Sequence, residues 1–94
     1  MITVTTRLLA AEGREDELEG TLLAICGTSL ASPGCDRSEV SKSAHNSRRF
    51  LLLARFADAD AQAAHANSES FAQALPALMD CLEGLPDIEV YEDL

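Results

Sequence analysis

The sequence predicts an α+β fold of β-α-β-β-α-β order, the ferredoxin-like arrangement, with helices on one face of an antiparallel four-stranded sheet. Segments that alternate between apolar and polar residues are interspersed with segments of helical periodicity. Gly or Pro residues separate many of them. With 94 residues the chain is long enough for one domain, which we take as residues 1–94.

The first strand and the first helix have clear signals. Residues 2–9 alternate and are rich in β-branched side chains, which predicts a strand. Gly13 follows, and then three acidic residues mark the start of a helix over about 14–31, because negative charge is favourable at a helix N-terminus. Its apolar stripe consists of Leu18, Leu22, Ile25, Cys26 and Leu30. A second stripe of small residues consists of Gly20, Ala24, Gly27 and Ala31. Either another backbone approaches this flank closely, or the flank faces solvent and tolerates glycine.

A hairpin follows the first helix. Ser32-Pro33-Gly34 ends the helix, since proline and glycine continue it only at a cost. Residues 35–42 form a rather polar strand, His45-Asn46-Ser47 a turn, and 49–56 a strand that is apolar on both faces. A strand of the latter kind is covered on both sides.

The last third of the chain predicts a broken helix and a final strand. Asp58 caps a helix over about 59–66, and Ser68 caps a further helix that extends towards Leu82. Pro76 lies inside that second segment and is expected to kink or divide it. Residues 87–92 form the last strand.

The distribution of apolar residues predicts both the order of the strands and a homodimer. The first and third strands are the apolar ones and take the centre of the sheet, whereas the second and fourth are edges. The third strand directs Phe50, Leu52 and Phe56 to one face and Leu51 and Leu53 to the other. Helices cover only one face, so we expect a second copy to stack on the other.

Composition excludes several classes of partner. The net charge of −9 argues against nucleic acid and against anionic membrane surfaces. No apolar run reaches the roughly 20 residues that a bilayer-spanning helix needs, and the start of the chain lacks the pattern of a secretion signal. The three cysteines form no CxxC pair, and an odd number suits a reducing compartment. We therefore expect a cytoplasmic protein, and with only two histidines in no ligand motif we expect no metal.

The whole chain resembles the antibiotic biosynthesis monooxygenase family of dimeric α/β barrels. The resemblance rests on the order of several segments, none of them decisive alone. These are Ile2-Thr3-Val4, Gly13 before an acidic helix start, Ser32-Pro33-Gly34-Cys35, the run Phe50 to Phe56 before Asp58, Ala64-His65-Ala66-Asn67-Ser68 with Phe71, and Ile88-Glu89-Val90-Tyr91-Glu92. The resemblance implies a cofactor-free homodimer that uses molecular oxygen to oxidise an electron-rich phenol, an anthrone or a small quinol.

The chain departs from the family pattern at several positions. Family members often have Tyr where this chain has Ser38, Glu-x-Trp where it has Ala54-Arg55-Phe56, and a second His where it has Ser70. A ligand-binding or stress-associated dimer without catalysis is therefore an alternative, and so is an isomerase of a small oxygenated metabolite. Haem degradation ranks last, because that branch uses a Trp and this chain has none.

His65 is the best candidate for a catalytic residue. An imidazole exchanges a proton near neutral pH, and a deprotonated phenol is itself electron-rich enough to reduce oxygen. The alternative is that His65 only bonds a backbone carbonyl. Arg7 and Arg55 lie on the apolar central strands, where either can hold a substrate oxygen or oxyanion. Alternatively they pair with acidic residues at the dimer seam, such as Glu39 or Glu89.

Four apolar side chains are candidates for an aromatic binding pocket between sheet and helices. They are Phe56, Phe71, Leu75 and Met79. The alternative is that this stripe is plain core. Cys35 is expected to be a buried small apolar residue rather than a nucleophile.

Overall fold

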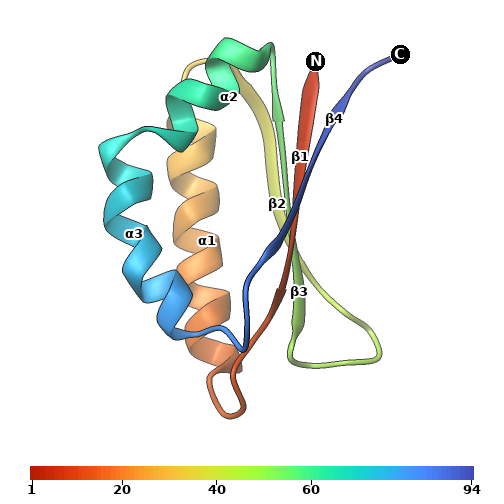
Figure 1. Cartoon of the computed structure of the whole chain (residues 1–94), viewed down its shortest axis with the longest axis vertical. Helices are drawn as coiled ribbons and strands as arrows, with labels where there is room; N and C mark the ends of the chain where they lie inside the picture. Colours follow the sequence, from red (N-terminus) through yellow and green to blue (C-terminus); the bar gives the residue numbers. More distant parts are fainter.

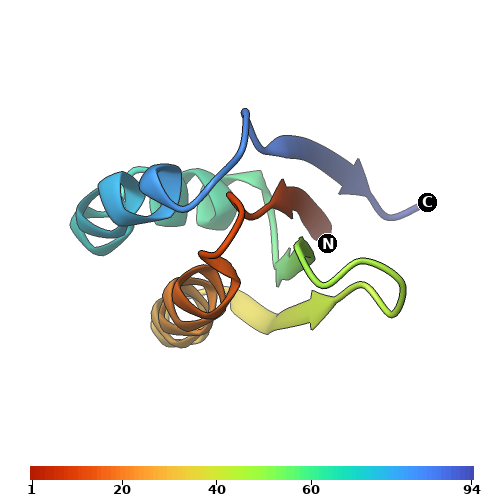
Figure 2. The same cartoon turned by 90° about the horizontal axis from the view of Figure 1, so that it is seen from below.

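The computed structural model describes all 94 residues and contains one antiparallel sheet of strand order β2-β3-β1-β4. The elements are β1 (Ile2–Leu9), α1 (Glu15–Ala31), β2 (Cys35–Lys42), β3 (Arg49–Phe56), α2 (Ala59–Ala66), α3 (Glu69–Asp80) and β4 (Asp87–Glu92). All three helices lie on one face of the sheet (Figure 1), and the opposite face is uncovered (Figure 2). This confirms the predicted fold class and the central position of β1 and β3. No helix is both long and apolar enough to span a membrane.

The register of the central strands decides which side chains meet the helices. Ile2 of β1 lies opposite Phe56 of β3, and Leu8 opposite Phe50. Side chains alternate between the two faces of a strand, so the even-numbered residues of β1 and β3 point towards the helices. The main hydrophobic core lies on this side, and its buried members are Leu8, Ala10, Leu18, Leu22, Ile25, Phe50, Leu78 and Cys81.

The buried stripe of α1 differs from the predicted one at its end. Leu30 was expected to be part of the stripe, but 51% of its surface is exposed, whereas Ser29 is only 2% exposed. The helical spacing explains the difference. Position 29 lies four residues after Ile25 and therefore on the same face of the helix, whereas position 30 is rotated a further 100° around the helix. A hydroxyl group therefore lies where an apolar side chain was expected.

The two predicted helix caps are confirmed. The carboxylate of Asp58 accepts a hydrogen bond from the backbone N–H of Ala61 at 2.8 Å, and the hydroxyl of Ser68 accepts one from Phe71 at 3.2 Å. The break between α2 and α3 therefore lies at residues 67–68. Pro76 does not divide α3, which continues to Asp80. Proline has no backbone N–H, so Pro76 donates no hydrogen bond to the carbonyl of Ala72. Both residues are exposed, and this carbonyl is therefore near solvent.

Candidate functional site

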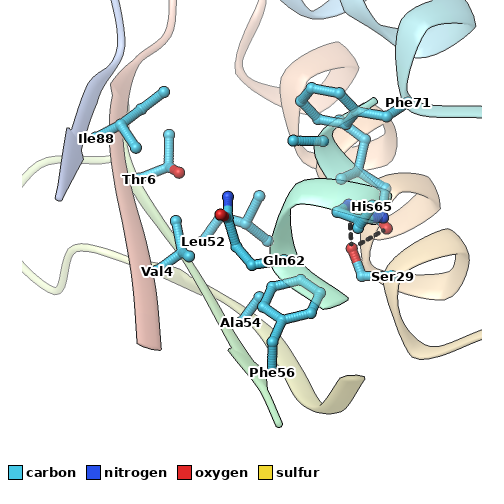
Figure 3. A pocket seen from close by; sticks show the side chains of 12 residues that line it. Val4, Thr6, Ser29, Leu52, Ala54, Phe56, Gln62, His65, Phe71 and Ile88 are labelled. Atoms are coloured by element: carbon cyan, nitrogen blue, oxygen red, sulfur yellow. Dashed lines mark hydrogen bonds between the residues drawn. The ribbon is translucent and has the colours of Figure 1, made fainter. Parts of the chain in front are cut away.

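A cavity of about 160 Å³ lies between the sheet and the helices (Figure 3). Twelve residues line it, and eight of them are hydrophobic. The strands contribute Val4, Thr6, Leu52, Ala54, Phe56 and Ile88, and the helices contribute Ile25, Ser29, Gln62, His65, Ala66 and Phe71. An apolar wall with a few polar groups is the usual character of a small-molecule site.

His65 is the titratable residue of the cavity wall, and both faces of its ring and both ring nitrogens have contacts within the protein. It lies in the last turn of α2 between two phenyl rings, with ring centroids 5.6 Å from Phe56 and 5.4 Å from Phe71. Its Nε2 atom is 3.1 Å from the hydroxyl of Ser29, and its Nδ1 atom is 3.2 Å from the hydroxyl of Ser32. Figure 3 shows the ring directed towards Ser29 on α1. Neither ring nitrogen is therefore free to meet a ligand directly.

Partial burial lowers the pKa of His65 from its ordinary value. Desolvation disfavours the charged imidazolium, and no charged side chain contributes to the shift. The neutral ring consequently predominates at neutral pH, with one nitrogen that can accept a proton.

The structure brings three of the predicted site residues together and leaves two apolar ones outside. His65, Phe56 and Phe71 line the cavity. Leu75 and Met79 do not, and they are 40% and 38% exposed. The inward face of α3 passes instead through Phe71, Ala74 and Leu78, so positions 75 and 79 are rotated by about 100° away from it.

The two predicted arginines lie on the other face of the sheet. Arg7 and Arg55 are odd-numbered residues of β1 and β3, and neither lines the cavity. Arg7 lies 3.8 Å from a carboxylate oxygen of Asp87, and Arg55 lies 3.1 Å from one of Asp93. Both arginines thus find acidic partners within their own chain, and these are not the two glutamates expected from sequence.

Three polar residues of the cavity were missed at the level of sequence. Gln62 precedes His65 by three positions, which is a spacing that puts both side chains on one helix face. Thr6 shares the inward face of β1 with Val4. Ser29 extends the buried stripe of α1. Helical and strand periodicity could have found all three once His65 was chosen.

The departures from the family pattern fall in different places. Ala54 and Phe56 line the cavity. The hydroxyl of Ser38 donates to Cys26 Sγ at 3.2 Å and is not part of the cavity wall, and Ser70 lies on a separate outer groove. No group of three or more His, Cys, Asp or Glu side chains is placed to hold a metal ion.

Comparison with known proteins gives a consistent result. The sequence model of the antibiotic biosynthesis monooxygenase family matches residues 1–77. No curated protein matches the chain by sequence.

Solved structures of similar fold come from several bacteria. A protein from Nitrosomonas europaea, described as a candidate antibiotic biosynthesis monooxygenase, superposes with a TM-score of 0.93 at 17% identity, over 100% of this chain and 99% of the other. A protein from Pseudomonas aeruginosa has a TM-score of 0.89 at 26% identity, over 99% and 93%. A conserved protein of unknown function from Bacteroides thetaiotaomicron has a TM-score of 0.90 at 20% identity, over 98% and 96%.

Proposed function

The chain belongs to the antibiotic biosynthesis monooxygenase family, and on that premise we propose that it is a cofactor-independent monooxygenase. It uses molecular oxygen to oxidise a small aromatic or quinol-type substrate. The observation that supports this proposal is the apolar cavity with His65 in its wall. An electron-rich substrate in a water-poor pocket needs little more than a proton acceptor to react with oxygen.

The size of the cavity favours a single aromatic ring. A cavity of about 150 Å³ is enough for benzene, whereas drug-sized ligands occupy about 300–1,000 Å³. At about 160 Å³ the cavity matches one ring of a quinol better than the three fused rings of an anthrone. The phenyl groups of Phe56 and Phe71 supply aromatic contacts, and Thr6 and Gln62 supply polar groups for ring substituents.

The substrate supplies the electrons, so the reaction balances without another reductant. A quinol loses a hydroxyl proton, its ring passes an electron to O2, and the two radicals combine as a peroxide on a ring carbon. Protonation of the peroxide and loss of water convert that carbon to a carbonyl. One oxygen atom enters the product and the other leaves as water, so that hydroquinone and O2 give hydroxyquinone and water.

Oxygen uptake tests this proposal. Purified protein is mixed with a panel of monocyclic hydroquinones and, separately, anthrones. We expect uptake well above the spontaneous rate with the former, and a decrease of about 10²-fold or more in His65→Gln, because acid–base catalysis contributes that much. The matched control is His45→Gln, which alters the other histidine, an exposed residue. The absence of uptake across both panels would contradict the monooxygenase proposal.

A binding protein without turnover is the second candidate, and one observation favours it. The two family positions that are often Glu and Trp are Ala54 and Phe56 here, and both line the cavity. That replacement removes an ionisable group and leaves a hydrophobic wall. A binding protein would raise its melting temperature with a ligand by mass action, without consuming oxygen. An isomerase would convert its substrate equally well under anaerobic conditions.

The cellular setting also remains a proposal. We propose that the protein acts in the cytoplasm as a homodimer. The three cysteines are free thiols, which suits a reducing compartment. The sheet face that the helices leave uncovered presents Leu51 and Leu53 for a second copy.

A further inference from the structure

The hydrogen bonds around His65 form a closed set. The hydroxyl of Ser29 donates to the Ile25 carbonyl at 3.0 Å, and that of Ser32 donates to the Thr28 carbonyl at 3.1 Å. The same two hydroxyl oxygens lie 3.1 Å and 3.2 Å from the ring nitrogens of His65. A hydroxyl has a single proton to donate, so a serine that donates to its helix carbonyl can only accept from the ring.

The protonation state of the ring decides how many of these bonds form together. The imidazolium has two N–H donors, and it alone makes all four bonds at once. With a neutral ring, one serine must turn its proton from the carbonyl to the bare nitrogen. When Ser29 turns, the Ile25 carbonyl keeps its ordinary bond inside the helix, whereas the backbone N–H of Ser32 bonds to the Ser29 carbonyl and not to that of Thr28. The two serines therefore accommodate both states, and they satisfy the charged state completely.

Helix ends favour the charged state as well. His65 lies in the last turn of α2, and Ser29 and Ser32 lie at the C-terminal end of α1. The C-terminus of a helix carries partial negative charge and stabilises a nearby cation. The other groups packed on the ring are Phe56 from β3 and Phe71 from α3, and neither is charged. These contributions oppose the desolvation that favours the neutral ring.

The two serines differ in what else they contact. Ser29 is buried and is one of the residues that line the cavity, and its oxygen lies 3.1 Å from Nε2. Ser32 lines a separate outer groove with Gly27 and Ala31 and is not part of the cavity wall. Of the two serines that contact the imidazole, Ser29 is therefore the one that also belongs to the cavity wall.

We propose that Ser29, His65 and Ser32 form a proton store for the cavity, in which Ser29 relays the substrate proton and both serines hold the imidazolium. This inference rests on the proposed function. The substrate O–H bond breaks as its proton passes to Ser29 Oγ, and Ser29 passes its own proton to Nε2. The products are an aryloxide and an imidazolium. After oxygen has added to the ring, the same proton returns through Ser29 to the peroxide, which then loses water.

The first test is a pH titration of His65 in the free protein, monitored by ¹⁵N NMR of the imidazole nitrogens. We expect Ser29→Ala and Ser32→Ala each to lower the midpoint of His65 by about one pH unit, because each removes an acceptor for a charged donor. The exposed His45 in the same spectra serves as an internal control and should not move. Unchanged midpoints for His65 in both variants would overturn the store.

Kinetics with a hydroquinone then separate the relay from the positioning role. We expect Ser29→Ala to lower kcat about 10²-fold, Ser32→Ala to lower it less than about 10-fold, and Ser29→Thr to retain most of it because the hydroxyl is kept. Equal effects of the two alanine variants on kcat would overturn the relay by Ser29. If the wild-type protein consumes no oxygen with any quinol, the proposed function fails, whereas the titration still decides whether the serines hold the imidazolium.

Discussion

At the scale of single residues, His65 has a role both in the packing of the cavity wall and in the proposed activity. The thiols of Cys35 and Cys81 do not compete with it as proton acceptors, because burial raises the pKa of each and both stay protonated near neutral pH. Among the residues that line the cavity, His65 alone carries a titratable side chain. Two phenyl rings shield its imidazole from water, and two serine hydroxyls form hydrogen bonds with its nitrogens.

The lowered pKa of His65 predicts a pH-dependent stability. The unfolded chain binds a proton at His65 at a higher pH than the folded protein does, so the contribution of the neutral ring is fully present above about pH 6.5 and is lost as the pH falls through the lowered pKa. The difference between the urea midpoints of wild type and His65→Gln, measured from about pH 5 to about pH 8, should therefore be constant above that pH and should shift against the wild type as the pH falls below it. A difference that stays constant over this range would contradict the prediction, and His45→Gln should behave like wild type.

The placement of α2 is the element-scale feature that brings His65 to the cavity. The turn between α1 and β2 contains Gly34, whose φ of +84° is favourable for glycine. A Cβ atom added there would lie 2.6 Å from the Cβ of Ala61 on α2. The missing side chain thus lets α2 pack closely against this turn.

Gly34→Ala should therefore destabilise the protein by about 1–3 kcal/mol, because it adds backbone strain to a clash. It should also weaken the contacts between His65 and the serines of α1. The free energy of unfolding, from urea titrations, measures the first effect.

The matched control is Gly20→Ala in α1. Nothing lies within 4 Å of a Cβ atom added at Gly20. Within one chain, the side of α1 that carries the small residues is therefore open at this position, which agrees with the interpretation that it faces solvent. We expect this variant to be more stable by about 0.5–1 kcal/mol, because alanine is the better helix residue. A loss of stability would instead indicate that a partner approaches this flank.

At the scale of the whole molecule, the helices leave one face of the sheet uncovered, and this is the face on which we propose that a second copy stacks. Leu51 and Leu53 point away from the helices, and they are only partly buried by their own chain. Strand β4 lies at the sheet edge, and all six of its residues are exposed. A second copy stacked on this face would bury the leucines of β3, which is the physical argument for the dimer.

Leu51→Asp should give monomers or insoluble protein, since a buried unpaired carboxylate is costly at such an interface. Light scattering after size-exclusion chromatography gives the mass in solution. The matched control is Leu23→Asp, which introduces the same charge at an exposed leucine of α1 on the helical side. A well-folded dimer of Leu51→Asp would rule out this face as the interface.

Local signals determined the secondary structure of this protein. The bounds of β1, β2, β3, α2 and β4 agree with the expected ranges, because side-chain alternation, helix caps and turn residues act over a few positions. The same signals, together with the apolar character of β1 and β3, predicted the order of the strands. The family resemblance of the segment around His65 pointed to the histidine that lies in the cavity wall.

Only the tertiary structure decided which residues meet around that histidine. Ser29 and Ser32 are 36 and 33 positions away from His65 in the chain, and their contact depends on how α1 and α2 pack on the sheet. The rotation of α3 likewise turns Leu75 and Met79 away from the cavity. Periodicity defines the faces of each element, but the angle at which two elements pack depends on all the side chains between them.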